Sequence, residues 1–521
     1  MTNLPYAQLL FFAAVLFFIL YPIVQYFRDP KRLRRFHNMS PLSGLSAAPF
    51  MIVAHGGFRS KYLEKLHQEY PVIRTGPNSL SYGDPRAIKD IYGHNTKCKK
   101  DELYTITMGS HFHLADVVDN KEHSRKRKVL SSAYALKNLE SWEHKVADKT
   151  ERLITHFDRM CTAPLPKGQK QPHPDDLNVD YRAWTNFFTI EAIADIGLSE
   201  RLGFLDTGSD LCSAEKLDGT TYEVGFRDAL YQNARKQSLL VWNYDWYPFI
   251  NKLVDIVPFY RRMSGHARDW DAIYLSRSSR RLKRYEAGEK LDDFFQALME
   301  DKNGSPNNLE WGEIVAEVGI MMNAGSATTA IAMANVMFQL LKNPTVMEKL
   351  RAEVDSVLDD HEVVASYDKI KHLPYLRACL DESLRLFPPT SHGLTRAVPP
   401  EGMDILGEYI PGGTSVSISA YVAHRDESIF PMAEKFIPER WLGEEGKRLQ
   451  PYFLAFSAGA RGCIGRNISY LEQTVLLASV LHRYEFALPS PDWEIKRLET
   501  MNLILGEMPV KVWRRRAKER A

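Results

Sequence analysis

Apolar residues recur every three to four positions along much of the chain, which is the spacing of helices with one buried face. The pattern covers most of residues 119–350 and is nearly continuous over residues 309–342, where Asn343-Pro344 stops it. At about 1.5 Å per residue, this last segment would form a helix roughly 50 Å long, enough to cross a whole domain. The pattern predicts a mostly helical protein with one long central helix.

A minority of segments alternate apolar and polar residues, as strands do. Residues 72–82 alternate around the turn signal Gly76-Pro77-Asn78, and residues 414–420 form another short strand pattern. The predicted fold class is therefore mostly α with minor β.

Three stretches interrupt the periodic segments. Residues 38–58 contain Ser, Gly and Pro without periodicity and are predicted to be a hinge, after which residues 58–69 have helical spacing. Residues 162–176 are predicted to be a Pro-rich loop and residues 207–221 a polar one. The sequence has no Gly/Ser linker, low-complexity tract or internal repeat, so we expect one large domain.

The first apolar run of the chain contains no charged residue. It covers residues 7–27, interrupted only by Gln8, Gln25 and Pro22, and as a helix it would span about 30 Å, the thickness of a bilayer core. A cleavable signal peptide is the alternative, but the positive charges follow the run and a small-residue cleavage site is missing. We predict a retained membrane anchor.

The basic residues directly after this run predict its orientation. An excess of positive charge favours the cytoplasmic side, and here it comes from Arg28, Lys31, Arg32, Arg34 and Arg35. The predicted organisation is a luminal segment (residues 1–6), a transmembrane anchor (7–27), a basic stop-transfer segment and hinge (28–57), and a catalytic domain (58–521).

Composition narrows the class of protein further. With 521 residues, 44% hydrophobic and 25% charged, the chain can bury a large core and is not disordered. Its net charge of +2 is too small to indicate a nucleic-acid-binding protein. Its five cysteines contain no CxxC pair, which favours free thiols in a reducing compartment over disulfides or a zinc site.

The surroundings of one cysteine carry the most chemical information. Around Cys463 the sequence reads Phe456-Ser-Ala-Gly-Ala-Arg461-Gly-Cys463-Ile-Gly465. A thiolate bound to iron needs hydrogen-bond donors, which glycines allow the backbone to bring close, and the following helix pattern places a positive helix end at the sulfur. Phe456 can cover the sulfur and Arg461 can meet a haem propionate. For an isolated cysteine, the alternative would be a buried residue at the start of a helix.

With Phe, Gly, Arg, Cys and Gly in these positions, the segment resembles the cysteine loop of the cytochrome P450 family. Glu382-Ser-Leu-Arg385 resembles the ExxR motif of that family, and residues 436–441 resemble its PER motif. The resemblance implies a helical haem domain with small sheets, and haem b whose iron takes Cys463 as axial ligand. It also implies a buried ion-pair network of Glu382, Arg385 and Arg440 that supports the cysteine loop.

The resemblance extends to groups that would bind the haem propionates. His123 and Arg127 lie four residues apart, so they share one face of a helix. The alternative for this pair is a basic surface patch, because Arg125, Lys126 and Lys128 are adjacent. Arg396 resembles the strand arginine that meets the other propionate.

The centre of the long helix reads Ala324-Gly-Ser-Ala327-Thr328-Thr329, a poor sequence for a helix interior. Such a sequence can open a bulge for dioxygen and water, because a threonine hydroxyl can bond the backbone. A plain packing helix is the alternative. By resemblance, Thr328 hydrogen-bonds dioxygen and helps deliver protons.

One position departs from the family pattern. The family usually has Asp or Glu directly before this threonine, and this chain has Ala327. The departure leaves the proton route open among a water chain, a carboxyl or hydroxyl group of the substrate, and turnover that leaks peroxide.

The resemblance implies a monooxygenase that inserts one oxygen atom from O2 into a hydrophobic small molecule. Without a dinucleotide-binding or flavin motif, the chain would need a separate NADPH-dependent flavoprotein reductase, and a small b-type haem protein could also donate electrons. Such microsomal enzymes are held in the endoplasmic reticulum membrane with the catalytic domain in the cytosol.

Two other functions compete with this reading. The first is a haem-thiolate isomerase or dehydratase, although such enzymes often lack the threonine that Thr328 represents here. The second is a haem protein for binding or sensing. Similarity around residues 92–94 and 122–128 points to the fungal branch that includes benzoate para-hydroxylases and secondary-metabolite tailoring enzymes. We expect secondary metabolism, with an aromatic-acid hydroxylase of primary catabolism as the alternative.

The substrate pocket is expected from five segments, namely residues 104–118, 226–250, 321–325, 390–394 and 501–506. Its apolar lining is expected from Phe112, Met321, Met322, Leu394 and Leu503, with His111, His113 and His392 as polar anchors. For each of these histidines, a packed or surface position is the alternative.

Overall fold

The computed structural model describes residues 8, 16–17, 20–107, 109–131, 133–134, 140–169, 171–216, 218–242 and 246–515. In this part of the chain the helices are α2 (Ala48–His55), α3 (Arg59–His67), α4 (Ala87–Tyr92), α5 (Asn120–Ser131), α7 (Glu143–Met160), α8 (Tyr181–Leu198), α9 (Phe204–Thr207), α10 (Phe226–Leu240), α11 (Tyr247–Leu253), α12 (Pro258–Glu286), α13 (Phe294–Met299), α14 (Trp311–Lys342), α15 (Pro344–Asp355), α16 (Tyr367–Ile370), α17 (Pro374–Leu386), α18 (Ala420–Ala423), α19 (Gly443–Leu449) and α20 (Arg466–Arg483).

The strands are short and belong to small sheets. They are β1 (His37–Asn38), β2 (Val72–Gly76), β3 (Ser79–Tyr82), β4 (Lys99–Lys100), β5 (Val179–Asp180), β6 (Leu211–Glu215), β7 (Thr221–Gly225), β8 (Arg396–Ala397), β9 (Met403–Ile405), β10 (Glu408–Ile410), β11 (Ser415–Ile418), β12 (Tyr484–Ala487), β13 (Arg497–Glu499), β14 (Leu503–Leu505) and β15 (Pro509–Arg514). The prediction of a mostly helical fold with minor β structure is confirmed.

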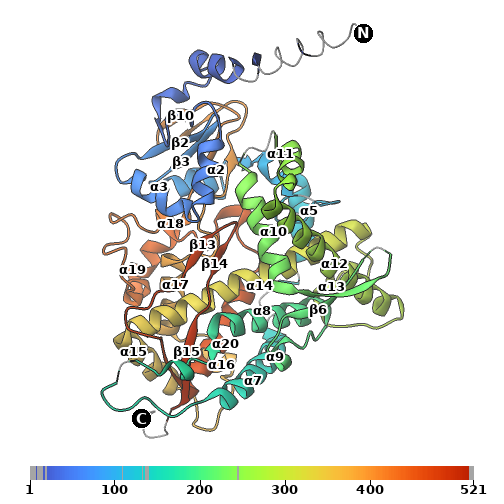
Figure 1. The fold of residues 1–521 in the computed structure, drawn as a ribbon, viewed down its shortest axis with the longest axis vertical. Helices are drawn as coiled ribbons and strands as arrows, with labels where there is room; N and C mark the ends of the chain where they lie inside the picture. Colours follow the sequence, from blue (N-terminus) through green and yellow to red (C-terminus); the bar gives the residue numbers. More distant parts are fainter. Residues whose placement is uncertain are drawn as a thin grey trace.

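The long helix α14 crosses the middle of the molecule (Figure 1). Apolar residues cover most of its circumference, so it is surrounded by other elements, chiefly α8, α12, α17 and α20. Gly325 lets α8 approach closely, because a Cβ atom there would lie 2.6 Å from Cγ1 of Ile193. The prediction of one long central helix is confirmed.

A six-stranded sheet forms a second, smaller core beside the helices. Its strand order is β1-β2-β3-β11-β8-β4, and β11 pairs parallel with β3 and antiparallel with β8. It joins strands from residues 37–100 to strands from residues 396–418, so segments far apart in the sequence lie side by side (Figure 1). The predicted strands around the turn at residues 76–78 are β2 and β3.

Two segments differ from the expectations. The expected hinge contains β1 and α2, and Leu33, Phe36 and Phe50 are buried, because its scattered apolar residues pack on the sheet rather than on one periodic face. The expected polar loop at residues 207–221 contains β6 and the start of β7, a hairpin whose Cys212 and Ala214 are buried against α12.

The predicted anchor, residues 7–27, lies largely outside the described residues. Within the part of the chain that the structure describes, one helix, α14, is long and apolar enough to cross a membrane, and 67% of its most apolar window is buried in the fold.

Candidate active site

A cavity of about 840 Å³ lies between α14 and the loop that carries Cys463. All five segments expected to line the substrate pocket contribute to its wall. The predicted site residues that line it are His123, Arg127, Thr328, Arg396, Phe456, Arg461 and Cys463. Glu382, Arg385 and Arg440 lie outside its wall, behind the cysteine loop.

Hydrogen bonds within the backbone fix the cysteine loop. The Cys463 N–H donates to the Phe456 carbonyl over 2.9 Å, and the Gly462 N–H donates to the Gly459 carbonyl over 3.0 Å. Gly459 has φ +65°, and a Cβ atom there would lie 2.8 Å from the carbonyl carbon of Gly93, so glycine is required. Arg127 closes the loop from α5, because its Nη1 donates to the Gly462 carbonyl over 2.9 Å.

The Cys463 side chain is exposed only in the sense that it faces the internal cavity. Burial raises the pKa of this thiol. The backbone N–H groups of Gly465 and Arg466, at the start of α20, and the positive charges of Arg127 and Arg466 act in the opposite direction on its pKa. These groups would stabilise a thiolate once a cation paired with it.

Behind the loop, Glu382 collects five hydrogen bonds while fully buried. Arg385 donates to both carboxylate oxygens, over 2.8 and 2.9 Å, and Arg440 Nε donates to Oε1 over 3.1 Å. Trp441 Nε1 and the Ile437 N–H supply the others, over 2.9 and 3.0 Å. The structure therefore brings the three predicted members of the network together, and adds two neutral donors.

His424 connects this network to the cysteine loop. Its Nε2 accepts from the Leu454 N–H over 2.8 Å, so Nδ1 carries the proton and donates to the Arg385 carbonyl over 3.0 Å. Burial lowers the pKa of His424 to about 3, with the nearby Arg385 charge adding to the effect. The role of His424 could not be predicted from the sequence, because its two partners come from distant segments.

Four cations converge at one end of the cavity. Arg396 lies opposite Lys100 in the β8–β4 pair, and Arg127 and Arg461 reach the same wall from α5 and the cysteine loop. Arg461 donates to the carbonyls of Val117 and Val118 over 2.6 and 3.0 Å. Among the described residues, none of the four forms an ion pair with a carboxylate; they donate to backbone carbonyls and to one amide oxygen, and Arg396 also interacts with the Tyr104 hydroxyl.

Such a cluster is unfavourable without an anion. Burial, with Arg396 as the next cause, lowers the pKa of Arg461 to about 10, and burial, Arg396 and Arg461 hold the pKa of Lys100 well below its usual value. The two carboxylates of a haem, placed above Cys463, would neutralise these charges, so the residues present fit that cofactor. Sequence reasoning missed Lys100, because its position beside Arg396 depends on the pairing of β4 with β8.

The opposite wall of the cavity is the middle of α14. Thr328 Oγ1 donates to the Ala324 carbonyl over 2.9 Å, and both residues line the cavity. Helix α14 stays α-helical through this point, so the expected bulge is not present. Ala327 is 2% exposed and belongs to the core, not to the cavity wall.

Part of the expected apolar lining is wrong. Met321 and Leu394 line the cavity, whereas Met322 and Leu503 are fully buried in the core and Phe112 is not part of the wall. Met322 differs from Met321 because neighbouring residues on a helix point about 100° apart. The three expected histidines, His111, His113 and His392, do line the cavity.

The cavity wall also contains four carboxyl residues that sequence reasoning missed, namely Asp116, Asp255, Asp271 and Glu317. Lys126 Nζ lies 3.3 Å from Oε1 of Glu317 on α14, and Asp116 accepts from the His113 N–H over 2.8 Å. Burial raises the pKa of Asp116 to about 7. None of these carboxyl groups is next to Thr328 in the sequence, the position at which the family usually has an acid.

Comparison with known proteins gives one consistent result. The model of the family "Cytochrome P450" matches residues 49–513. The chain is 30% identical to the cytochrome P450 monooxygenase cicH of Emericella nidulans, over 92% of this chain and 93% of that protein. It is 29% identical to the cytochrome P450 monooxygenase efuB of Hormonema carpetanum (86% and 85% covered) and 27% identical to the benzoate 4-monooxygenase bphA of Aspergillus niger (89% and 90% covered).

Proposed function

This chain belongs to the cytochrome P450 family, and from that premise we propose that it oxidises a hydrophobic small molecule in fungal secondary metabolism with NADPH-derived electrons. Members of the family are monooxygenases, oxidoreductases that carry haem b with its iron and need O2 and a redox partner. The observation that carries the proposal is the cavity with a cysteine sulfur at its floor and unpaired cations at its edge.

We assign the haem-holding roles as follows. Cys463 Sγ would be the axial ligand of the iron, with the N–H groups of Gly465 and Arg466 directed at the sulfur. Phe456 would cover the sulfur side. The propionates would be held by His123, Arg127, Arg396 and Arg461, with Lys100 as an addition from the structure. When bound, the haem supplies an iron centre that activates dioxygen.

Proton delivery falls to Thr328 and to the contents of the cavity. Thr328 Oγ1 donates to the Ala324 carbonyl, so its lone pairs can accept a hydrogen bond from water or substrate, and its own proton can be passed on once the bond to Ala324 opens. Because Ala327 has no proton to give and faces the core, a water chain or a substrate hydroxyl or carboxyl would supply protons to Thr328.

The electron donor is proposed to be a separate NADPH-dependent flavoprotein reductase, with a small b-type haem protein as a second donor. The exposed Arg466, three residues after Cys463, lies at the start of α20 and can attract an acidic partner to the sulfur side of the haem.

The proposed location is the endoplasmic reticulum membrane, with the catalytic domain in the cytosol. Residues 7–27 support it by their length and lack of charge. So does a group of exposed apolar side chains in and beside α11, namely Trp246, Phe249, Leu253, Ile256, Val257 and Phe259. This group adjoins α2, because His55 Nε2 and Tyr260 Oη are 2.5 Å apart, and α2 adds the exposed Ile52.

A second candidate is an aromatic-acid hydroxylase of the benzoate type. The similarity to the Aspergillus niger benzoate 4-monooxygenase favours it. Isomerase or dehydratase chemistry is a weaker candidate, because Thr328 lines the cavity in the position of an oxygen-handling residue.

The deciding experiment is metabolite profiling of a strain from which the gene is deleted, followed by reaction of the purified enzyme with the compound that accumulates. We expect that compound to be lighter than the product by one oxygen atom, and its conversion to require NADPH, O2 and reductase. Conversion that proceeds without NADPH and O2 would establish an isomerase or dehydratase instead. Conversion of benzoate itself would favour the second candidate.

A further inference from the structure

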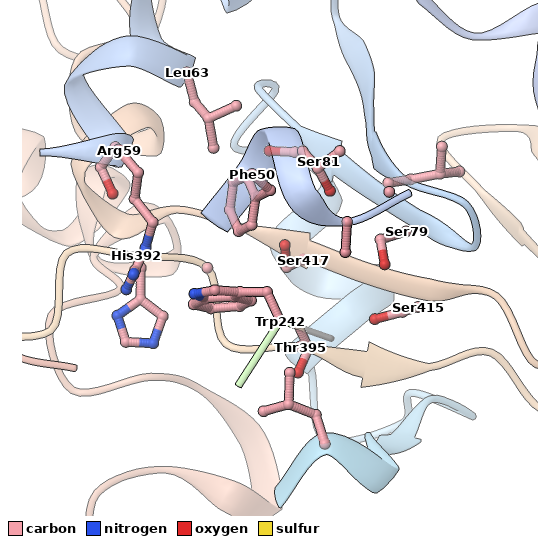
Figure 2. A pocket seen from close by; sticks show the side chains of 17 residues that line it. Phe50, Arg59, Leu63, Ser79, Ser81, Trp242, His392, Thr395, Ser415 and Ser417 are labelled. Atoms are coloured by element: carbon pink, nitrogen blue, oxygen red, sulfur yellow. The ribbon is translucent and has the colours of Figure 1, made fainter. Parts of the chain in front are cut away.

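One face of the six-stranded sheet carries serines where a buried sheet normally carries apolar residues. β3 and β11 pair in parallel so that Ser79 lies beside Ser415 and Ser81 beside Ser417, and alternation points all four to the same side. All four line a small second chamber, shown in Figure 2 with the serines on the sheet and the aromatic residues opposite. A face built of hydroxyl groups is suited to polar contents rather than to packing.

The remaining walls of this serine chamber are rigid and electrically neutral. Arg59 Nε lies 2.8 Å from Oε1 of Glu499, and both side chains are almost fully buried. The Arg59 guanidinium also lies 4.5 Å from the centre of a Trp242 ring, and Phe50 packs edge-on against Trp242 at 4.9 Å. The one buried cation beside the chamber is therefore already neutralised by a carboxylate.

Several polar groups at the chamber have no protein partner. Ser60 Oγ and His392 Nδ1 are buried without a hydrogen bond to any described residue. The Ser79, Ser415 and Ser417 hydroxyls form no side-chain hydrogen bond within the described part of the chain either, in contrast to Ser81, which bonds His67. The chamber has a volume of about 40 Å³, room for roughly three water molecules or for one small polar group.

His392 lies between the serine chamber and the catalytic cavity, since this residue lines both. It is 5% exposed, and its ring meets Trp242 edge-on at 5.9 Å. Burial, together with the Arg59 charge, keeps the pKa of His392 well below its usual value, so the ring is neutral and has one nitrogen to donate and one to accept.

We propose that the serine chamber is a polar subsite of the catalytic cavity, reached past His392, that takes an uncharged hydroxyl- or carbonyl-bearing group of the substrate. This inference rests on the proposed function, because the rest of that substrate must lie over the haem. An alcohol, amide or lactone carbonyl finds donors and acceptors there from Ser415, Ser417 and His392. A carboxylate would lose its hydration without gaining a free cation, because Arg59 is paired with Glu499.

The subsite can be tested before the substrate is known, with imidazoles whose ring nitrogen binds the haem iron and shifts its Soret band to the red. A series of N-alkylimidazoles of increasing tether length would be titrated into the full-length holoenzyme, each with a methyl, primary alcohol or carboxylate end. At the tether length that reaches the chamber, we expect the alcohol to bind about tenfold more tightly than the methyl probe, and the carboxylate more weakly than the alcohol.

The variants Ser415→Ala with Ser417→Ala, and separately His392→Phe, should reduce the alcohol preference to about one, because each removes partners of the alcohol. Ser276→Ala, a buried serine that bonds the Ile273 carbonyl and lines neither cavity, should leave it unchanged. Methyl-probe affinity reports whether each variant still holds its haem.

Three outcomes would overturn the inference: no alcohol preference at any tether length, a preference that survives in both chamber variants, or a preference for the carboxylate. A methyl probe that causes no red shift in the wild-type protein would instead overturn the haem site and with it the proposed function.

Discussion

At the scale of single residues, the chemistry of the cavity depends on a cluster of four cations and on Ala327, which stands where a carboxyl group is expected. Lys100, Arg127, Arg396 and Arg461 crowd one wall without carboxylate partners among the described residues, which is unfavourable until an anion arrives. On the facing wall, the carboxyl group expected before Thr328 is replaced by the buried methyl group of Ala327. The wall that carries Arg396 is therefore rich in positive charge, and the position before Thr328 supplies no proton donor.

Replacement of Lys100 with Met tests whether the cluster of cations holds the haem propionates. We expect haem to dissociate several-fold faster, because one charged partner of the propionates is lost. The haem-free protein should unfold at a higher temperature, because repulsion from Arg396 and Arg461 is relieved. The neighbouring and exposed Lys99→Met is the control and should change neither quantity. Equal haem loss in both variants would show that Lys100 does not contact the cofactor.

Replacement of Ala327 with Asp tests whether the missing carboxyl group before Thr328 limits proton delivery. We expect the product formed per NADPH consumed to change by about twofold or more, because a carboxyl group at this position could donate protons to Thr328 once it turned from the core toward the cavity. Ala327→Asn is the matched control, since it has the same size without the acid. Peroxide release and product are measured together. Unchanged coupling in the Asp variant would mean that the native proton route already bypasses this position.

At the scale of elements, the cysteine loop is held by segments that meet only in three dimensions. The buried Glu382 on α17 binds Arg385 and Arg440, and His424 joins the Arg385 carbonyl to the Leu454 N–H at the start of the loop. These links are fully buried, so each is sensitive to loss of one partner. The position of the cysteine sulfur therefore depends on α17 and on the segment after it.

Arg385→Leu should break this support. Because the substitution leaves Glu382 buried with one charged partner fewer, we expect a loss of about 3–5 kcal/mol in the free energy of unfolding, together with loss of haem. Arg448→Leu removes an exposed arginine that pairs with Glu445 and should cost less than about 0.5 kcal/mol. Thermal unfolding and haem content measure both. A haem-loaded Arg385→Leu protein of normal stability would contradict the role assigned to the network.

His424 predicts a specific pH dependence. Its pKa is about 3 when folded and near 6.5 when unfolded, so between these values only the unfolded chain binds this proton. The stabilisation is complete above pH 6.5 and is lost as the pH falls toward 3, at about 1.4 kcal/mol per pH unit. His424→Gln should lack this contribution, so its stability should fall less steeply across that window than that of the wild type. Equal slopes, measured by denaturant unfolding, would contradict the assignment; the exposed His144→Gln is the control.

At the scale of the whole molecule, the sheet and the exposed apolar group beside α11 lie toward the same end as the N-terminal segment (Figure 1). Phe249 and Ile256 are 63% and 69% exposed, which is uncommon for such side chains. A membrane anchor at that end would bring this surface to the bilayer.

A chain that starts at Arg28 should therefore still bind phospholipid vesicles through this surface. The double change Phe249→Ser and Ile256→Ser should weaken binding at least about tenfold, because each side chain contributes roughly 1.5–3 kcal/mol when buried in an apolar phase. Leu211→Ser, an exposed apolar residue on the β6–β7 hairpin, should have no effect. Vesicle sedimentation measures the three proteins, and equal binding by all of them would argue against this surface.

The sequence by itself determined the features that depend on neighbours along the chain. Helix α14 follows from its apolar periodicity, strands β2 and β3 from alternation around residues 76–78, and the cysteine loop from residues at fixed short spacing. The sequence did not predict the structure of the expected hinge or of the polar loop. There, β1, α2 and the β6–β7 hairpin are stabilised by packing against distant elements.

Only the tertiary structure decided which distant residues share a site. The β4–β8 pairing put Lys100 beside Arg396, and the pairing of β3 with β11 made the serine chamber. His424 has the Leu454 N–H and the Arg385 carbonyl as partners, and these come from two different segments. The physical reason is that periodicity reports which face of an element is buried, while the partner across that face is set by how the chain closes its long loops.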